Sequence, residues 1–67
     1  MRKEKRKKLF KMKVKRMERG LTQAQLAEKI GCSHITIFQY EAGWRVPKKE
    51  TLEKIAVALD CKVKDIQ

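Results

Sequence analysis

The 67-residue sequence has few of the residues that mark a metal-bound, disulfide-stapled or membrane-spanning protein. It contains two cysteines and one histidine, and Cys32 with His34 alone provides too few ligands for a structural zinc. We therefore expect no metal, and two reduced cysteines that act as small hydrophobic side chains. No apolar run approaches the roughly 20 residues that a membrane span requires. The start lacks the pattern of a signal peptide, so we expect a cytoplasmic protein.

Glycine and proline are also scarce, since the chain has three glycines and one proline. No segment alternates between apolar and polar residues, and no internal repeat is present, so the sequence predicts an all-α fold. It also lacks a carboxylate pair, a nucleophile–base set and a phosphate-cradling glycine loop. A chain this short cannot build a deep catalytic cleft beside a core, so we expect neither an enzyme nor a bound cofactor.

Positive charge, by contrast, is abundant and unevenly placed. The chain carries 18 Lys and Arg against 8 Asp and Glu, a net charge of +10. Residues 1–19 hold 11 of these cations and two glutamates, which amounts to +9 of that charge. This balance indicates a nucleic acid or another anionic surface as partner.

The chain divides into a basic arm over residues 1–8 and a domain over residues 9–67. The arm is either a solvated tail or a segment that follows DNA phosphates, and we favour the second. A basic amphipathic helix on a membrane surface is the weaker alternative, because so small a domain needs the apolar stripe of its first helix for the core. The basic residues of the arm are Arg2, Lys3, Lys5, Arg6, Lys7 and Lys8.

The first helix is predicted by apolar side chains that recur with helical spacing. Leu9, Met12 and Met17 are expected to face the core, with Phe10 and Val14 alongside. A glycine after these residues is typical of a helix C-terminus.

Two short helices follow, and local signals fix their ends. Thr22 and Gln25 have the spacing of a capping box. Gly31 is placed where the chain must turn sharply with a positive φ, and Ser33 is a favourable N-cap for the next helix, which runs to about Ala42.

These two helices are expected to pack as a helix-turn-helix. Leu26, Ala27 and Ile30 form the buried stripe of the first of them, and Ile37 and Tyr40 pack the second onto it. This arrangement projects the second helix far enough to enter the major groove of DNA.

A fourth amphipathic helix is marked by Leu52, Ile55, Ala56 and Leu59. A last turn is expected at residues 63–66.

With these motifs, the chain resembles the phage-repressor/Cro-type helix-turn-helix proteins, in the group named after the xenobiotic response element. The resemblance implies a compact, lambda-repressor-like bundle of four or five helices that binds specific DNA sequences to control transcription. The residues that carry it are Arg16, Gly20 to Gln23, Leu26, Ala27, Ile30, Gly31, Ser33, Ile37, Tyr40, Glu41, Gly43, Pro47, Thr51, Leu52, Ile55, Ala56, Ala58, Leu59, Asp65 and Ile66.

The resemblance also implies roles for single residues. Gln39 would bond adenine, and Ile35 or the methyl group of Thr36 would pack on a thymine methyl. Arg16 and Glu41 would form a structural ion pair between the first and third helices. The predicted base contacts are Ser33, His34, Ile35, Thr36 and Gln39. The predicted phosphate contacts are Gln23, Gly43, Trp44, Arg45 and Lys48.

Several positions depart from the family pattern. Phe38 replaces a small or polar residue and suggests packing or a subunit contact. Ala42 lacks the polar side chain that touches a phosphate in some relatives. Lys49 replaces an apolar residue, and Asp60 replaces a glycine. For Trp44, closing the core as a loop aromatic is as plausible as a phosphate contact.

These features favour a transcriptional regulator that binds double-stranded DNA as a homodimer on a pseudo-palindromic site, with no small-molecule ligand evident. The alternative is the antitoxin of a DNA-binding toxin–antitoxin pair or another protein-interaction module. Such proteins usually add a partner-binding segment, and a chain ending at Gln67 is expected to leave little room for one.

Overall fold

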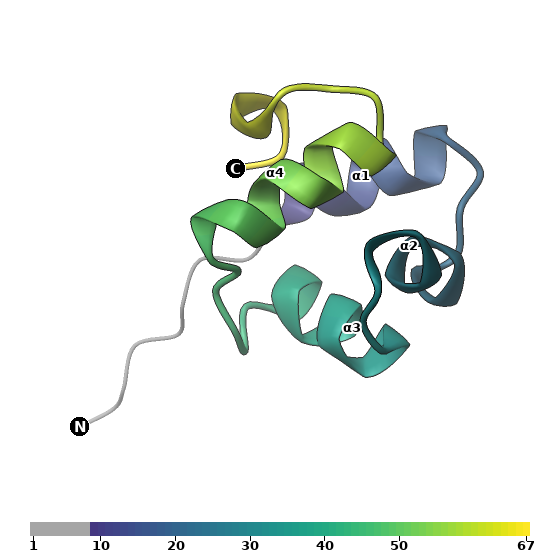
Figure 1. Cartoon of the computed structure of the whole chain (residues 1–67), viewed down its shortest axis with the longest axis vertical. Helices are drawn as coiled ribbons and strands as arrows, with labels where there is room; N and C mark the ends of the chain where they lie inside the picture. Colours follow the sequence, from purple (N-terminus) through teal and green to yellow (C-terminus); the bar gives the residue numbers. More distant parts are fainter. Residues whose placement is uncertain (1–8) are drawn as a thin grey trace.

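The computed structural model describes residues 9–67, and the basic arm predicted for residues 1–8 lies outside the described residues. Within this range the chain forms four α-helices and one 3-10 turn, with no strand (Figure 1). The predicted all-α fold with four helices is confirmed for these residues. The elements are α1 (Phe10–Glu18), α2 (Gln23–Ile30), α3 (His34–Ala42), α4 (Lys49–Ala58) and η1 (Val63–Asp65).

One apolar core joins all of these elements. The short helices α2 and α3 pack on each other, and α4 packs on both α2 and η1. Helices of eight to ten residues are marginal alone, so this burial stabilises them. The buried apolar residues are Leu9, Met12, Leu26, Ala27, Ile37, Tyr40, Leu52, Ile55, Ala56, Leu59 and Ile66.

The core differs from the sequence prediction on α1. Met17 was expected inside but is 60% exposed, and Arg16 takes the inward position with only 8% of its surface exposed. The physical reason is that Arg16 meets the buried carboxylate of Glu41 on α3. A periodicity of apolar residues cannot predict a buried cation, because its partner is 25 residues away.

The ends of α2 are formed by the predicted local signals. The Thr22 hydroxyl accepts a hydrogen bond from the Gln25 backbone N–H at 3.0 Å, and the Thr22 N–H donates to the Gln25 side-chain oxygen at 2.8 Å. Gly31 ends the helix at φ +80°. This left-handed conformation is unfavourable for any residue that has a Cβ atom, so glycine is preferred there. The three-residue turn to α3 depends on this glycine.

The end of α4 has a similar turn without a glycine. Asp60 adopts φ +56°, and Asp is one of the few non-glycine residues that tolerate this region. The chain then closes over the core with η1, whose neighbour Ile66 is fully buried. No helix in the described part of the chain is long and apolar enough to span a bilayer.

Candidate nucleic-acid interface

The outward face of α3 lies along one edge of the molecule, while α4 and η1 lie on the opposite side (Figure 1). Ile37 and Tyr40 hold the inner face of α3 in the core, with 0% and 7% exposure. On the outer face Ser33, His34 and Ile35 are exposed, and 55% of the Ile35 surface is accessible.

Two further predicted base-contact residues, Thr36 and Gln39, are half-buried beside that outer face. The Ser33 hydroxyl caps α3 by accepting the Thr36 backbone N–H at 3.3 Å, and it lies 3.4 Å from the Thr36 hydroxyl. Among residues 9–67, nothing is hydrogen-bonded to the side-chain amide of Gln39. Its donor and acceptor therefore remain free for an external partner.

The loop after α3 turns back against the helix. Gly43 is buried at φ +86°, and its N–H is already bonded to the Tyr40 carbonyl at 3.3 Å. The Gln39 carbonyl accepts the backbone N–H of Trp44 at 2.8 Å and of Arg45 at 3.2 Å. The role of Gly43 is therefore to allow a tight turn, and this turn brings Trp44 and Arg45 beside α3.

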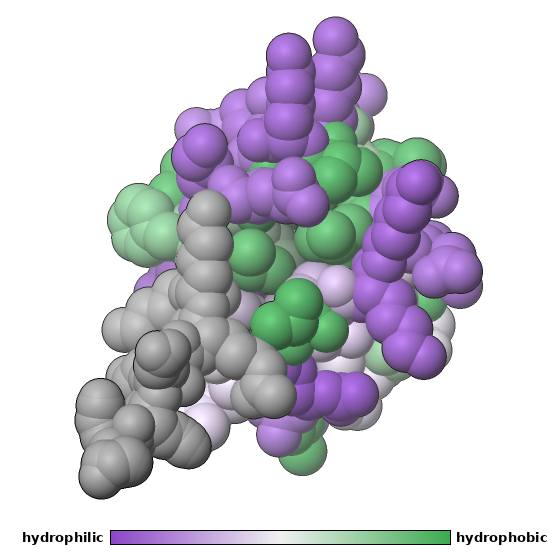
Figure 2. Space-filling model, turned by 90° about the vertical axis from the view of Figure 1, so that its left-hand side faces the viewer, coloured by the Kyte–Doolittle hydropathy of each residue, from purple (hydrophilic) through white to green (hydrophobic). Residues whose placement is uncertain are grey.

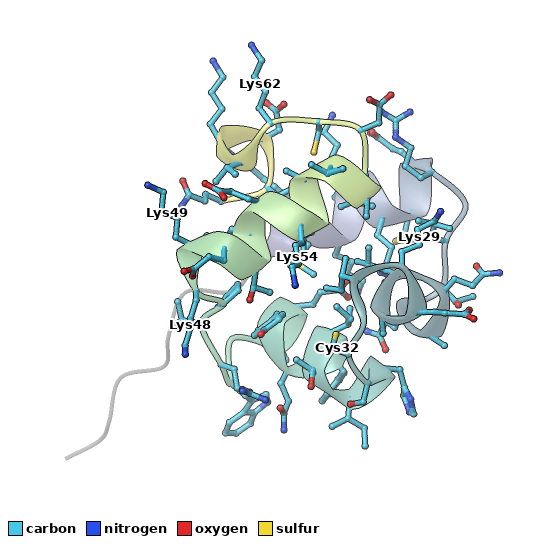
Figure 3. All side chains as sticks on the ribbon, viewed as in Figure 1. Lys29, Cys32, Lys48, Lys49, Lys54 and Lys62 are labelled. Carbon is cyan, nitrogen blue, oxygen red and sulfur yellow. The ribbon has the colours of Figure 1, made fainter. Side chains whose placement is uncertain are left out.

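Most side chains of this loop are exposed, among them Trp44, Arg45 and Lys48, whereas Pro47 is buried. Trp44 is 64% exposed, so it does not close the core, which was one of the two alternatives for this residue. The Arg45 guanidinium lies 5.8 Å from the centre of the Tyr40 ring, a cation–π distance. Lys48 extends toward the side on which α3 lies, whereas Lys62 points away from it (Figure 3).

A buried polar network fixes the start of α2 relative to α3. Arg16 Nε donates to Glu41 Oε2 at 2.7 Å, and Arg16 Nη2 donates to Glu41 Oε1 at 3.1 Å. Arg16 Nη1 donates to the Leu21 carbonyl at 2.8 Å. This bidentate ion pair between Arg16 and Glu41 is the one that the resemblance implied.

Gln23 belongs to the same network, which the sequence did not indicate. Its side-chain Nε2 donates to Glu41 Oε1 at 3.1 Å. One amide proton of Gln23 is therefore used inside the protein, and the side chain is held at the N-terminus of α2. Its second amide proton and its oxygen remain available to a ligand there.

Charge is distributed unequally between α1 and α3. Helix α1 carries Lys11, Lys13, Lys15 and Arg16, whereas α3 contains no Lys or Arg. Any contact that α3 makes with a nucleic acid must use hydrogen bonds and apolar packing rather than charge.

The two cysteines are free and partly buried. Burial raises the pKa of the Cys32 thiol, and nearby Arg45 opposes this effect. Burial also raises the pKa of Cys61, together with the negative charges of Asp65 and Asp60. No group of three or more His, Cys, Asp or Glu side chains able to hold a metal occurs among residues 9–67.

Comparison with curated proteins identifies a relative that is a repressor. The chain is 42% identical over 50 residues to the cryptic phage CTXphi transcriptional repressor RstR of Vibrio cholerae. The match covers 72% of this chain but 45% of that protein, so the chain spans less than half the length of this relative.

Solved structures with this fold include regulators bound to DNA. The P22 c2 repressor in complex with a synthetic operator has a TM-score of 0.80 and 26% identity, covering 85% of this chain and 86% of the repressor. SinR, a master regulator for biofilm formation solved in complex with DNA, has a TM-score of 0.76 and 30% identity. That match covers 82% of this chain and 89% of SinR.

A family model described as helix-turn-helix matches residues 12–66, which is most of the chain. The relatives named above are transcriptional regulators and not enzymes, in agreement with the sequence prediction. The match extends from α1 through η1 and includes both helices of the motif. The chain therefore belongs to the helix-turn-helix family, in its phage-repressor, xenobiotic-response-element branch.

Proposed function

We propose that this protein is a transcriptional regulator that binds double-stranded DNA and distinguishes sequences with α3 in the major groove. The observation that carries this proposal is the outer face of α3, which combines an exposed aliphatic side chain, Ile35, with the uncommitted amide of Gln39. These two groups match a thymine methyl and the paired donor and acceptor of adenine. The proposed base contacts are Ser33, His34, Ile35, Thr36 and Gln39.

The flanking elements suit contacts to the DNA backbone. Gln23 at the N-terminus of α2 offers an amide proton beside the first backbone N–H groups of that helix. Trp44, Arg45 and Lys48 follow α3 in an outward-pointing loop, and Gly43 provides its turn. Such contacts would fix the position of the protein on the duplex without reading its sequence.

We also propose that the protein acts as a homodimer on a pseudo-palindromic site. A two-fold axis would place the two copies of α3 about 34 Å apart, one turn of DNA. The relatives that are repressors, one of them solved on an operator, support this class of function. Such a regulator would work in the cytoplasm, held on the nucleoid through its DNA.

Random-site selection on the purified protein, with its mass measured in solution, tests this proposal. We expect enrichment of one half-site sequence, repeated with two-fold symmetry if the protein is a dimer. A matched pair of variants localises the readout: Ile35→Ala on α3 should change the selected sequence. Val57→Ala, an equally conservative change at an 80% exposed position of α4, should not. Absence of any enriched sequence at moderate salt would refute the proposal.

A further inference from the structure

Helix α1 presents apolar side chains on two opposite faces. Its inner face is buried through Met12 and Arg16, next to the buried Leu9. On the opposite face Phe10 is 67% exposed, Met17 is 60% exposed, and Val14 is half-buried between them. The spacings of four and three residues place these side chains in one stripe.

A surface groove of about 360 Å³ runs beside this stripe, between α1 and η1. Phe10 and Val14 line it together with Lys11, Lys15 and Lys64. Seen from the left-hand side of Figure 1, the described surface carries hydrophobic areas between long hydrophilic side chains (Figure 2). A stripe next to a groove differs from single exposed apolar residues, which need no explanation.

The charges around the groove are unequally available. Glu18 lies 3.6 Å from the ammonium group of Lys15, and a carboxylate oxygen of Asp65 accepts the backbone N–H of Lys62 at 3.0 Å. Within the described residues, Lys11, Lys13 and Lys64 form no ion pair. The acidic groups are thus engaged, while cations on both sides of the stripe are open to a partner.

We propose that the stripe of Phe10, Val14 and Met17, with the groove beside it, is a docking surface for an acidic amphipathic helix of another protein. The stripe spans seven residues, or about 10 Å, which matches two turns of a docked helix. Apolar side chains of the partner helix lie along the stripe, and its flanking carboxylates meet the free lysines.

The observations favour this occupant over three others. A second copy docked stripe against stripe would bring the lysines that flank the stripe, Lys11, Lys13 and Lys64, against their own counterparts. An anionic bilayer is flat, so it would not fill the groove. DNA would gain nothing from the apolar stripe.

Fluorescence anisotropy with synthetic helical peptides tests the proposal on the full chain. One peptide has leucines at helical spacing flanked by glutamates, and a second has the same composition in scrambled order. We expect the ordered peptide to bind at least tenfold more tightly than the scrambled one. The double variant Val14→Thr with Met17→Gln should lose that tenfold preference, with its helical circular dichroism unchanged. Val57→Gln, on the exposed face of α4, should retain it.

Three results would overturn the proposal. Equal binding of the scrambled peptide would mean that charge alone attracts it. Co-sedimentation with phosphatidylglycerol vesicles, lost in the double variant, would assign the stripe to a membrane. Self-association that the double variant abolishes would assign it to a second copy. DNA binding by the double variant should be unchanged, so this test can fail while the proposed regulatory function stands.

Discussion

Helices α1 and α3 are both nine residues long, yet their sequences differ in kind. Helix α1 has four Lys and Arg residues and one Glu, whereas α3 has no Lys or Arg and one Glu. That single glutamate, Glu41, is the buried partner of Arg16 on α1. Both helices also expose large apolar side chains, such as Phe10 on α1 and Ile35 on α3.

Under the proposed function, the difference separates two tasks of a basic protein, attraction to DNA and discrimination between DNA sequences. Positive charge attracts every DNA sequence equally, because the phosphate backbone is the same everywhere. Discrimination requires groups that fit base edges, and these need not be charged. Under the proposed function, the charge of the arm and α1 supplies affinity, and the neutral face of α3 supplies specificity.

The largest effect, on the free energy of unfolding, is expected from breaking the Arg16–Glu41 ion pair between α1 and α3. Glu41→Leu leaves the guanidinium of Arg16 buried without its counter-charge and removes the acceptor of Gln23. We expect a loss of about 3–5 kcal/mol in the free energy of unfolding, measured by urea denaturation. For so small a domain that loss approaches the whole stability.

A compensating variant serves as the control for this prediction. Arg16→Met combined with Glu41→Leu removes both charges and should recover most of the lost stability. If Glu41→Leu alone unfolds at the same urea concentration as the parent, the pair does not join the two helices.

The next largest effect is expected from removing the basic arm. Deleting residues 1–8 removes six cations, and each neutralised phosphate contributes about 0.9 to the log–log salt slope. Binding to all DNA sequences should weaken alike, and the slope should flatten by up to about 5. Titrations of a selected and an unrelated duplex at several salt concentrations measure both. A change confined to sequence preference would instead make the arm a base reader.

A smaller and more selective effect on DNA binding is expected from a substitution on the outer face of α3. Gln39→Ala should cost about 1–3 kcal/mol on the selected site and relax preference at one or two base pairs. Gln67→Ala, at an exposed glutamine outside α3, should leave that preference intact. Competition binding with single-base-pair substitutions of the site provides the measurement. Equal losses on every duplex would place Gln39 against the backbone.

The smallest effect, on the salt dependence of DNA binding, is expected from alanine substitutions at a matched pair of lysines. Lys48 points toward the side of α3, and Lys62 points away (Figure 3). Lys48→Ala should reduce the salt slope by about 1 without altering the preferred sequence, and Lys62→Ala should leave the slope unchanged. Equal changes in both variants would show that only total charge matters, and not its position relative to α3.

Much of the fold follows from local signals. The capping box of Thr22 and Gln25, the turn at Gly31 and the cap at Ser33 each depend on residues at most three positions apart. Interactions of this range form within a single turn, so their sequence spacing predicts their structure.

The prediction was wrong for α1, where Met17 was placed in the core. Apolar spacing alone allowed either face of this helix to turn inward. The choice depends on Arg16, whose partner Glu41 is distant in sequence. The hydrogen bond from Gln23 to Glu41, 18 residues away, escaped the sequence for the same reason. For Trp44 the sequence left two alternatives, and its 64% exposure excludes closure of the core. The predicted DNA contacts rest on the family resemblance and remain predictions.

The sequence by itself determined the helical fold, the helix-turn-helix and the imbalance of charge, because spacing, caps and composition are local properties. Only the tertiary structure decided which face of α1 is buried, how Gln23 is held and where the lysines point. Those outcomes depend on distant side chains meeting in one core, where a buried charge must find its partner. The exposed stripe on α1 is a consequence of that choice, since burying Arg16 turned Phe10 and Met17 outward.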